Sequence, residues 1–135
     1  MPVEKVFVYG TLRRGYQLHE HLLEPRSRYL GPGKIRGRLY DLGEYPGALP
    51  ADGPGDVVAG EVYELTDPES QLRVLDELEE FDPSKPEESL FVRRTTDVVL
   101  DSGRKVQAWT YFLPRQPPRA RRIPSGDYAH RRRVS

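Results

Sequence analysis

The chain has 135 residues, with 21 basic and 21 acidic side chains, so its formal net charge is zero. This balance provides no overall field that would attract nucleic acid or an anionic membrane. Hydrophobic residues make up 36% of the chain and charged residues 31%, a composition that excludes a disordered chain. The absence of cysteine excludes disulfides, a thiolate nucleophile and a cysteine-bound metal.

The length favours a single domain over residues 1–135, with a proline- and arginine-rich C-terminal segment at 114–135. No signal peptide precedes Val3, and no apolar run approaches the ~18 residues that a membrane-spanning helix needs, so we expect a soluble, cytoplasmic protein with no membrane partner. Arginines dominate the C-terminal segment, which leaves polyanion binding as a minor hypothesis. We do not expect nucleic acid as a partner, because aromatic and basic residues do not alternate there.

The first half of the chain predicts three strands. Residues 3–9 form a strand covered on both faces, because four apolar residues follow one another up to Tyr9. A turn at residues 10–15 and a short helix over 18–23, ended by Pro25, come next. Residues 29–42 and 57–65 read as strands, and the glycine- and proline-rich residues 43–55 between them read as a surface loop.

The clearest prediction is a helix over residues 67–81, with Asp67 as N-cap and Pro68 at the first helical position. At about 100° per residue, one arc of this helix holds apolar side chains and also the Glu79 carboxylate. The apolar side chains of this arc are Leu72, Val74, Leu75, Leu78 and Phe81. The opposite, solvent-facing arc holds Glu69, Arg73, Asp76, Glu77 and Glu80.

The second half of the chain predicts an exposed excursion at residues 82–89, then a hairpin of strands 91–100 and 105–113 across residues 101–104. Pro114, Pro117 and Pro118 are expected to end the sheet. The fold class is therefore α+β: a small, mostly antiparallel curled sheet or β-barrel with one main helix.

Two features of this pattern suggest chemistry. Glu79 in an apolar arc must be paired, neutralised by a raised pKa, or facing a cavity, because burying an unpaired carboxylate costs several kcal/mol. Catalysis and a structural ion pair with an arginine such as Arg93 both remain open at this point. The turn from Tyr9 to Leu12 could present backbone N–H groups to an anion, although the local pattern alone favours a strand that simply ends in a turn. His19 and His21 point away from each other on a helix, so we assign no metal site.

Five segments in order carry a resemblance: residues 8–15 (VYGTLRRG), 37–40 (GRLY), 45–47 (YPG), 75–79 (LDELE) and 108–111 (AWTY). In this order and spacing they resemble the gamma-glutamylcyclotransferase-like family over about residues 6–128. The resemblance implies a small barrel whose pocket is formed by the first turn and the helix glutamate. It also implies release of 5-oxoproline from a small-molecule gamma-glutamyl substrate, by attack of the substrate's own α-amine, without water or a cofactor.

The same resemblance assigns roles to residues. Glu79 is the general acid/base, and the glutamyl portion of the substrate is held by Tyr9, Gly10, Thr11 and Leu12. Tyr111 adds a hydroxyl at the pocket edge, and Arg93 binds or orients a carboxylate. The substrate is a gamma-glutamyl amine or amino acid, and the oligomeric state is not predicted.

The sequence departs from the family at three places. Relatives often have glycine where this chain has Glu80, and tyrosine where it has Phe91. An insertion at residues 83–89 lies next to the predicted pocket. If these changes disable the site, the alternative is a non-catalytic small-molecule binding protein that retains the gamma-glutamyl pocket.

Overall fold

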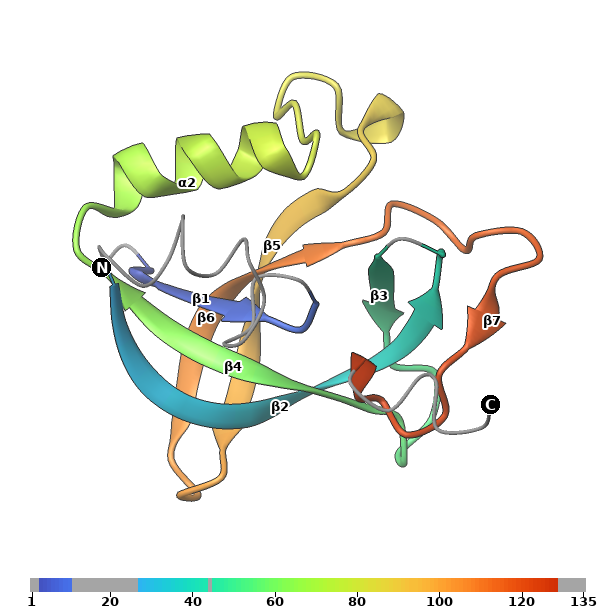
Figure 1. Ribbon diagram of the computed structural model, residues 1–135, viewed down its shortest axis with the longest axis horizontal. Coiled ribbons are helices and arrows are strands. Elements are labelled where there is room, and N and C mark those ends of the chain that lie inside the picture. The colour runs from blue at the N-terminus through green and yellow to red at the C-terminus, as the bar shows by residue number, and fades with distance from the viewer. Residues whose placement is uncertain (1–2, 11–26, 44, 129–135) are drawn as a thin grey trace.

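The structure, a computed structural model, describes residues 3–10, 27–43 and 45–128. The predicted turn and helix over residues 11–23, with His19 and His21, lie outside these ranges. Figure 1 shows the described elements, which in chain order are β1 (Lys5–Val8), β2 (Ser27–Asp41), β3 (Pro46–Pro50), β4 (Val57–Leu65), the helix α2 (Pro68–Leu78), the 3-10 helix η2 (Pro86–Glu88), β5 (Val92–Leu100), β6 (Lys105–Phe112) and β7 (Arg121–Arg122).

The strands form one seven-stranded sheet that closes on itself. Pairing runs from β1 to β4, β2, β5 and β6, and the parallel pair of β6 with β1 closes the barrel. All other pairs around the barrel are antiparallel. Outside this ring, β7 pairs with β2, and β3 pairs antiparallel with β2 and parallel with β6. The predicted α+β class, with a mostly antiparallel barrel and one main helix, is confirmed.

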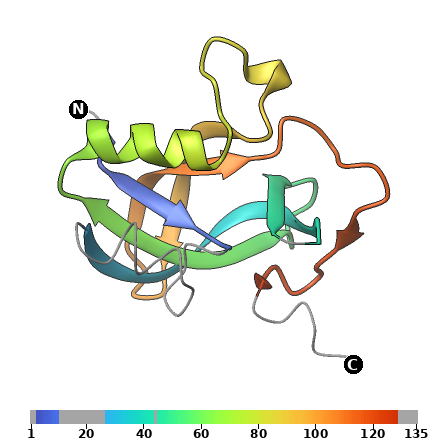
Figure 2. The ribbon, with the colours of Figure 1, turned by 45° about the horizontal axis from the view of Figure 1, so that its top comes forward.

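The strand β1 is buried on both sides, as its unbroken apolar run predicts. Phe7 points into the core inside the barrel, whereas Val6 and Val8 belong to a second core between the barrel and α2. Figures 1 and 2 show α2 lying along the side of the barrel that contains β1. One strand therefore contributes to both cores, and its end is held beside the helix.

The hairpin of β5 and β6 and the strand β4 agree with the sequence prediction, but two other segments do not. The predicted surface loop contains β3, whose first four residues are buried and which pairs with β2 over five residues. The prolines after β6 do not end the sheet, because β7 pairs with β2 at Tyr40 and Asp41. Both strands are too short and too rich in proline, glycine or arginine for a periodic signal, and long-range pairing decides their structure.

The excursion between α2 and β5 is exposed from residue 82 to residue 88, as predicted. Its base is tied together by Ser89, whose hydroxyl accepts a hydrogen bond from the Asp82 N–H at 2.9 Å and donates one to the Lys85 carbonyl at 2.9 Å. Within the described ranges, every helix is too short or too polar to cross a membrane.

The helix α2 begins at Pro68 after the N-cap Asp67, as predicted, but ends at Leu78, three residues early. Only Leu72 and Leu75 of the predicted apolar arc are buried, since Val74 is 46% exposed and Leu78 39% exposed. The predicted arc was therefore wrong at these two positions. The helix rests on the barrel through a narrow stripe, and the chain turns away after it.

A Schellman motif ends α2 and fixes the backbone of Glu79. The Phe81 N–H donates to the Asp76 carbonyl at 2.8 Å, and the Glu80 N–H donates to the Glu77 carbonyl at 3.2 Å. Glu80 accordingly has φ 53°, the left-handed conformation that glycine usually supplies at this position. Glu79 is the C-cap, so the motif sets the direction in which its side chain leaves the helix.

We predict that Glu80→Gly stabilises the protein by about 0.5–1 kcal/mol. A left-handed non-glycine residue costs about 1–2 kcal/mol, and the greater freedom of glycine in the unfolded chain offsets part of the gain. Urea unfolding measures the difference. Glu77→Gly is the matched control, because the same replacement inside the helix should lower stability by about 1 kcal/mol. Equal losses in both variants would contradict the strain at Glu80.

Candidate active site

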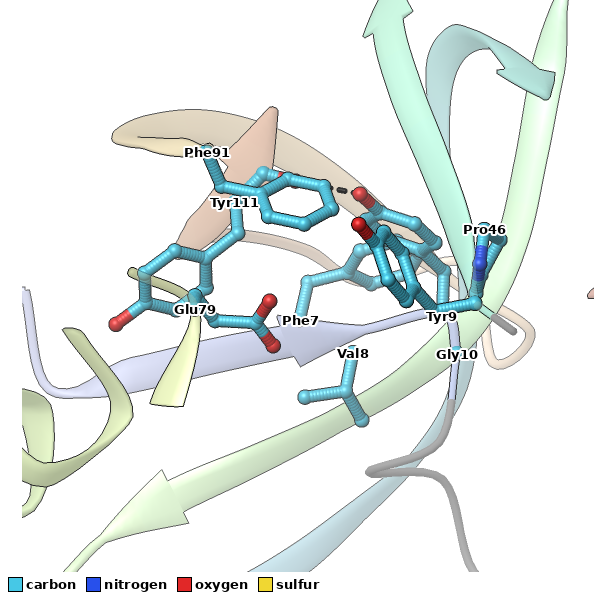
Figure 3. A pocket seen from close by; sticks show the side chains of 9 residues that line it. Phe7, Val8, Tyr9, Gly10, Pro46, Glu79, Phe91 and Tyr111 are labelled. Carbon is cyan, nitrogen blue, oxygen red and sulfur yellow. Dashed lines mark hydrogen bonds between the residues drawn. The ribbon is translucent and has the colours of Figure 1, made fainter. Parts of the chain in front are cut away.

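A pocket lies between the ends of β1, α2 and β6, the start of β5 and the segment that leads into β3 (Figure 3). It encloses about 420 Å³ of empty space, part of it open to solvent. Its lining is Phe7, Val8, Tyr9, Gly10, Tyr45, Pro46, Glu79, Phe91 and Tyr111. Among these described lining residues, Glu79 carries the only charge.

Glu79 points its carboxylate from the end of α2 into the pocket, as Figure 3 shows. Burial against the apolar and aromatic lining raises the pKa of this carboxyl from 4.5 to about 7. Within the described part of the chain, its side chain forms no hydrogen bond or ion pair. A carboxyl group in this state gains and loses a proton close to neutral pH, as a general acid/base must.

Arg93 does not pair with Glu79. The structural ion pair between these two residues was the alternative to catalysis that the sequence left open. Its guanidinium binds Asp76 with two hydrogen bonds, Nε to Oδ1 at 2.7 Å and Nη2 to Oδ2 at 3.1 Å. The guanidinium carbon also lies 4.4 Å from the centre of the Trp109 ring, a cation–π contact. The carboxylate that Arg93 orients in this structure therefore belongs to the protein itself.

Asp76 is the residue near the site that the sequence prediction placed wrongly, on the solvent-facing side of the helix. Its side chain is only 13% exposed. The position of Asp76 three residues before Glu79 was the available signal, because side chains three apart are neighbours on a helix. The angular position of Asp76 on the helix could not reveal that its partner lies on β5.

Tyr111 places its ring in the pocket lining, but its hydroxyl donates to Asp76 Oδ1 at 2.6 Å. In Figure 3 this hydroxyl points to the side opposite the Glu79 carboxylate. Burial, and then the bond to Asp76, raise the pKa of Tyr111 well above its usual value. The hydroxyl that the sequence assigned to the pocket edge is thus engaged behind the pocket wall.

Tyr9 is also engaged through its hydroxyl, with two backbone groups. The hydroxyl donates to the Tyr111 carbonyl at 2.6 Å and accepts from the Ala48 N–H at 3.1 Å. Burial, together with the charge of Glu79, raises the pKa of Tyr9 far above its usual value. Tyr9 therefore ties β1 to β3 and β6, and presents only its ring to the pocket.

Gly10 forms a corner of the pocket where only glycine fits. A Cβ atom at this position would lie 2.9 Å from Cγ of Pro46, closer than such atoms approach in proteins. The close packing of Gly10 and Pro46 brings the chain after β1 against the segment leading into β3. Thr11 and Leu12, the remaining predicted binding residues, lie outside the described residues.

An aromatic pair forms another wall. The rings of Tyr45 and Phe91 lie 5.9 Å apart at 59°, and Phe91 is only 3% exposed. Phe91 therefore supplies an apolar surface to this wall. The sequence prediction did not name Phe7, Val8, Tyr45 or Pro46 as site residues, although the segments 8–15 and 45–47 contain three of them.

Comparison with known proteins supports the family resemblance seen in the sequence. The model of the family described as "Gamma-glutamyl cyclotransferase, AIG2-like" matches residues 6–130. The chain is 38% identical over 111 residues to the gamma-L-glutamyl-butirosin B gamma-glutamyl cyclotransferase of Niallia circulans, covering 82% of this chain and 67% of that protein. It is 33% identical over 133 residues to the gamma-glutamylaminecyclotransferase of Bos taurus, covering 90% and 73%.

A solved structure supports the fold as well. The crystal structure of an AIG2-like protein from Mus musculus matches with a TM-score of 0.67 and 29% identity, over 87% of this chain and 82% of that one. The family match extends from β1, through the helix that carries Glu79, to the end of the described residues. The chain therefore belongs to the AIG2-like gamma-glutamyl cyclotransferase family.

Proposed function

We propose that this protein is a gamma-glutamyl cyclotransferase that releases 5-oxoproline from a gamma-glutamyl amine or amino acid. The observation that carries the proposal is Glu79: a carboxyl with no partner among the described residues, with a pKa of about 7, at the wall of a pocket whose described lining is otherwise uncharged. The names of the two relatives above both describe gamma-glutamyl cyclotransfer, which supports the same reaction. The name of the Bos taurus relative specifies a gamma-glutamylamine, which favours an amine as the leaving group.

In the proposed reaction, the Glu79 carboxylate takes a proton from the substrate's α-ammonium group. The free amine then attacks the γ-carbonyl carbon, and a five-membered ring closes through a tetrahedral intermediate. Glu79 returns the proton to the leaving nitrogen as the old amide bond breaks, and a second proton from the ring nitrogen follows the same route. Because one group must act first as base and then as acid, a pKa near neutrality suits it.

Substrate binding is assigned mainly to the surfaces around the end of β1. We propose that the Tyr9 ring, Gly10, Thr11 and Leu12 hold the glutamyl portion, with backbone N–H groups facing its carboxylate or the developing oxyanion. Tyr111 contributes its ring, since its hydroxyl binds Asp76. Arg93 acts on the site indirectly, through Asp76. The Phe91 and Tyr45 rings present an apolar surface to the rest of the substrate.

The test is an assay of 5-oxoproline release from a panel that contains gamma-glutamyl amines, gamma-glutamyl amino acids and glutathione. We expect release from members of the first two classes. If no compound is turned over, calorimetry with the same panel decides what remains. Binding without product over hours would support the alternative of a non-catalytic binding protein, and absence of binding would reject both.

We predict that kcat/KM rises with pH through a midpoint of about 7, because only ionised Glu79 can accept the first proton. At pH 5.5 the value should be about thirtyfold below its plateau, since each pH unit below the pKa reduces the ionised fraction about tenfold. A midpoint near 4.5, the ordinary value of a glutamate, would show that the active base is not a sheltered carboxyl.

A further inference from the structure

Resting on the proposed function, we propose that Asp76 is a positioning residue that binds two nearby hydrogen-bond donors and so keeps both of them away from the Glu79 carboxylate. The two donors are the Arg93 guanidinium and the Tyr111 hydroxyl. In this role Asp76 touches no substrate. As a result, the Glu79 carboxyl group has no partner among the described residues, although the Arg93 guanidinium and the Tyr111 hydroxyl both bind the same end of the helix.

The first support is the relation of the two carboxylates. Asp76 precedes Glu79 by three residues, and side chains at this spacing have Cβ atoms about 5–6 Å apart on a helix. The Glu79 N–H still donates to the Leu75 carbonyl at 2.9 Å, so helical geometry continues to this position. Tyr111, one of the two donors to Asp76, lines the same pocket as Glu79.

The second support is how completely Asp76 is occupied. Its Oδ1 accepts from Arg93 Nε at 2.7 Å and from the Tyr111 hydroxyl at 2.6 Å, while Oδ2 accepts from Arg93 Nη2 at 3.1 Å. The side chains of Asp76 and Arg93 are only 13% and 17% exposed, so water competes weakly for these bonds. The Trp109 ring stacks on the guanidinium and restricts its movement.

The third support is the contrast with Glu79. An opposite charge within about 4–6 Å lowers a carboxyl pKa by about one to three pH units, and such a group would be a poor base near neutral pH. Burial alone accounts for the raised pKa of Glu79, with no contribution from a cation. The Arg93 guanidinium is held on Asp76 instead.

No described residue that lines the pocket with Glu79 carries a positive charge that could pair with it. The titratable groups that line the pocket with Glu79 are Tyr9 after β1, Tyr45 before β3 and Tyr111 on β6. Through Tyr111 the pocket adjoins Asp76 on α2 and its partner Arg93 on β5, and Arg93 is the one cation among these residues. The Tyr9 hydroxyl is already bound by two backbone groups, and Glu80 beside Glu79 is exposed to solvent.

The test measures the Glu79 carboxyl pKa directly, by carbon-13 NMR titration of the wild type, Asp76→Asn and the double variant Asp76→Asn/Arg93→Met. We expect about 7 in the wild type. In Asp76→Asn the released guanidinium should lower it by about one pH unit or more. The double variant, which lacks the cation, should return to the wild-type value.

The double variant separates two explanations. It lacks the Asp76 charge and frees the Tyr111 hydroxyl as the single variant does, so a pKa that stays low there would mean that release of Arg93 is not the cause. That result would overturn the proposed hold of Asp76 on Arg93. An unchanged Glu79 pKa in folded Asp76→Asn would overturn it as well.

If Asp76→Asn does not fold, the wild type provides the decisive measurement. The nitrogen-15 and proton signals of the Arg93 guanidinium are followed from pH 5 to pH 8, across the ionisation of Glu79. We expect the guanidinium to remain bound to Asp76 throughout. Transfer of its contacts to Glu79 as that group ionises would show that Asp76 does not hold it.

Both NMR measurements are independent of turnover, so the two proposals fail separately. Absence of 5-oxoproline release from every compound, with the pKa pattern as expected, would reject the proposed function alone. An active enzyme in which Asp76→Asn leaves both the Glu79 pKa and the midpoint of the kcat/KM profile unchanged would reject the role of Asp76 alone.

Discussion

Glu79→Gln should reduce 5-oxoproline release by about 100- to 10,000-fold, the usual contribution of a general acid/base. Glutamine has nearly the same shape as glutamate and fits the same pocket wall, but it cannot accept a proton from the α-ammonium group or return one to the leaving nitrogen. The structure offers no second carboxylate in the described pocket lining that could substitute. The loss should therefore appear mainly in kcat and not in KM.

The same substitution should make the protein more stable above pH 7. The Glu79 pKa is about 7 in the folded protein, against an ordinary value of 4.5. Below pH 4.5 the group is neutral in both states; as pH rises toward 7 the unfolded chain ionises first, so folded stability falls. Each pH unit corresponds to about 1.4 kcal/mol, and partial exposure of the group reduces the sum to about 1–2 kcal/mol.

Opposite changes in activity and stability distinguish this prediction from general damage. The measurements are 5-oxoproline release and urea unfolding at pH 5 and pH 8. Glu77→Gln is the matched control, because Glu77 is an exposed residue of the same helix, and it should alter neither quantity. Full activity in Glu79→Gln would remove Glu79 as the acid/base group. A variant that is both inactive and less stable at pH 8 would point to a structural role instead.

Several features of the site could be predicted from the sequence because they depend on local periodicity. The burial of Glu79 on the side of α2 that faces the barrel follows from the 3.6-residue repeat, and β1 follows from its unbroken apolar run. The barrel strands have alternating or continuous apolar patterns of adequate length. These signals need no knowledge of distant partners, and the structure agrees with them.

The features that the sequence did not predict depend on partners distant in the chain. Asp76 reads as a surface acid until Arg93, on a strand after the excursion, supplies its partner. The helix appeared to continue to Phe81, because Glu80 conceals a left-handed turn that glycine would have marked. The Tyr111 hydroxyl appeared available for substrate, since its bond to Asp76 crosses between elements.

The Tyr9 hydroxyl also bonds to groups that are distant in the chain, and its removal gives the second large prediction. Tyr9→Phe should destabilise the protein by about 2–3 kcal/mol. Its hydroxyl is the partner of the buried Ala48 N–H and donates to the Tyr111 carbonyl, and leaving a buried polar group without a partner costs about 1–3 kcal/mol. Since whole domains are stable by only about 5–15 kcal/mol, urea unfolding should detect the loss easily.

Activity then tests whether the Tyr9 hydroxyl also binds substrate. Because both sides of the hydroxyl are engaged with backbone groups, the folded fraction of Tyr9→Phe should keep KM within about threefold of the wild-type value, a difference of less than 1 kcal/mol. Tyr45→Phe is the matched control: Tyr45 lines the same pocket, and its hydroxyl has no hydrogen bond within the described residues, so stability should change by less than about 0.5 kcal/mol. A stable Tyr9→Phe with a strongly raised KM would instead place the hydroxyl on the substrate, because a group that holds only the fold cannot weaken binding while leaving unfolding unchanged.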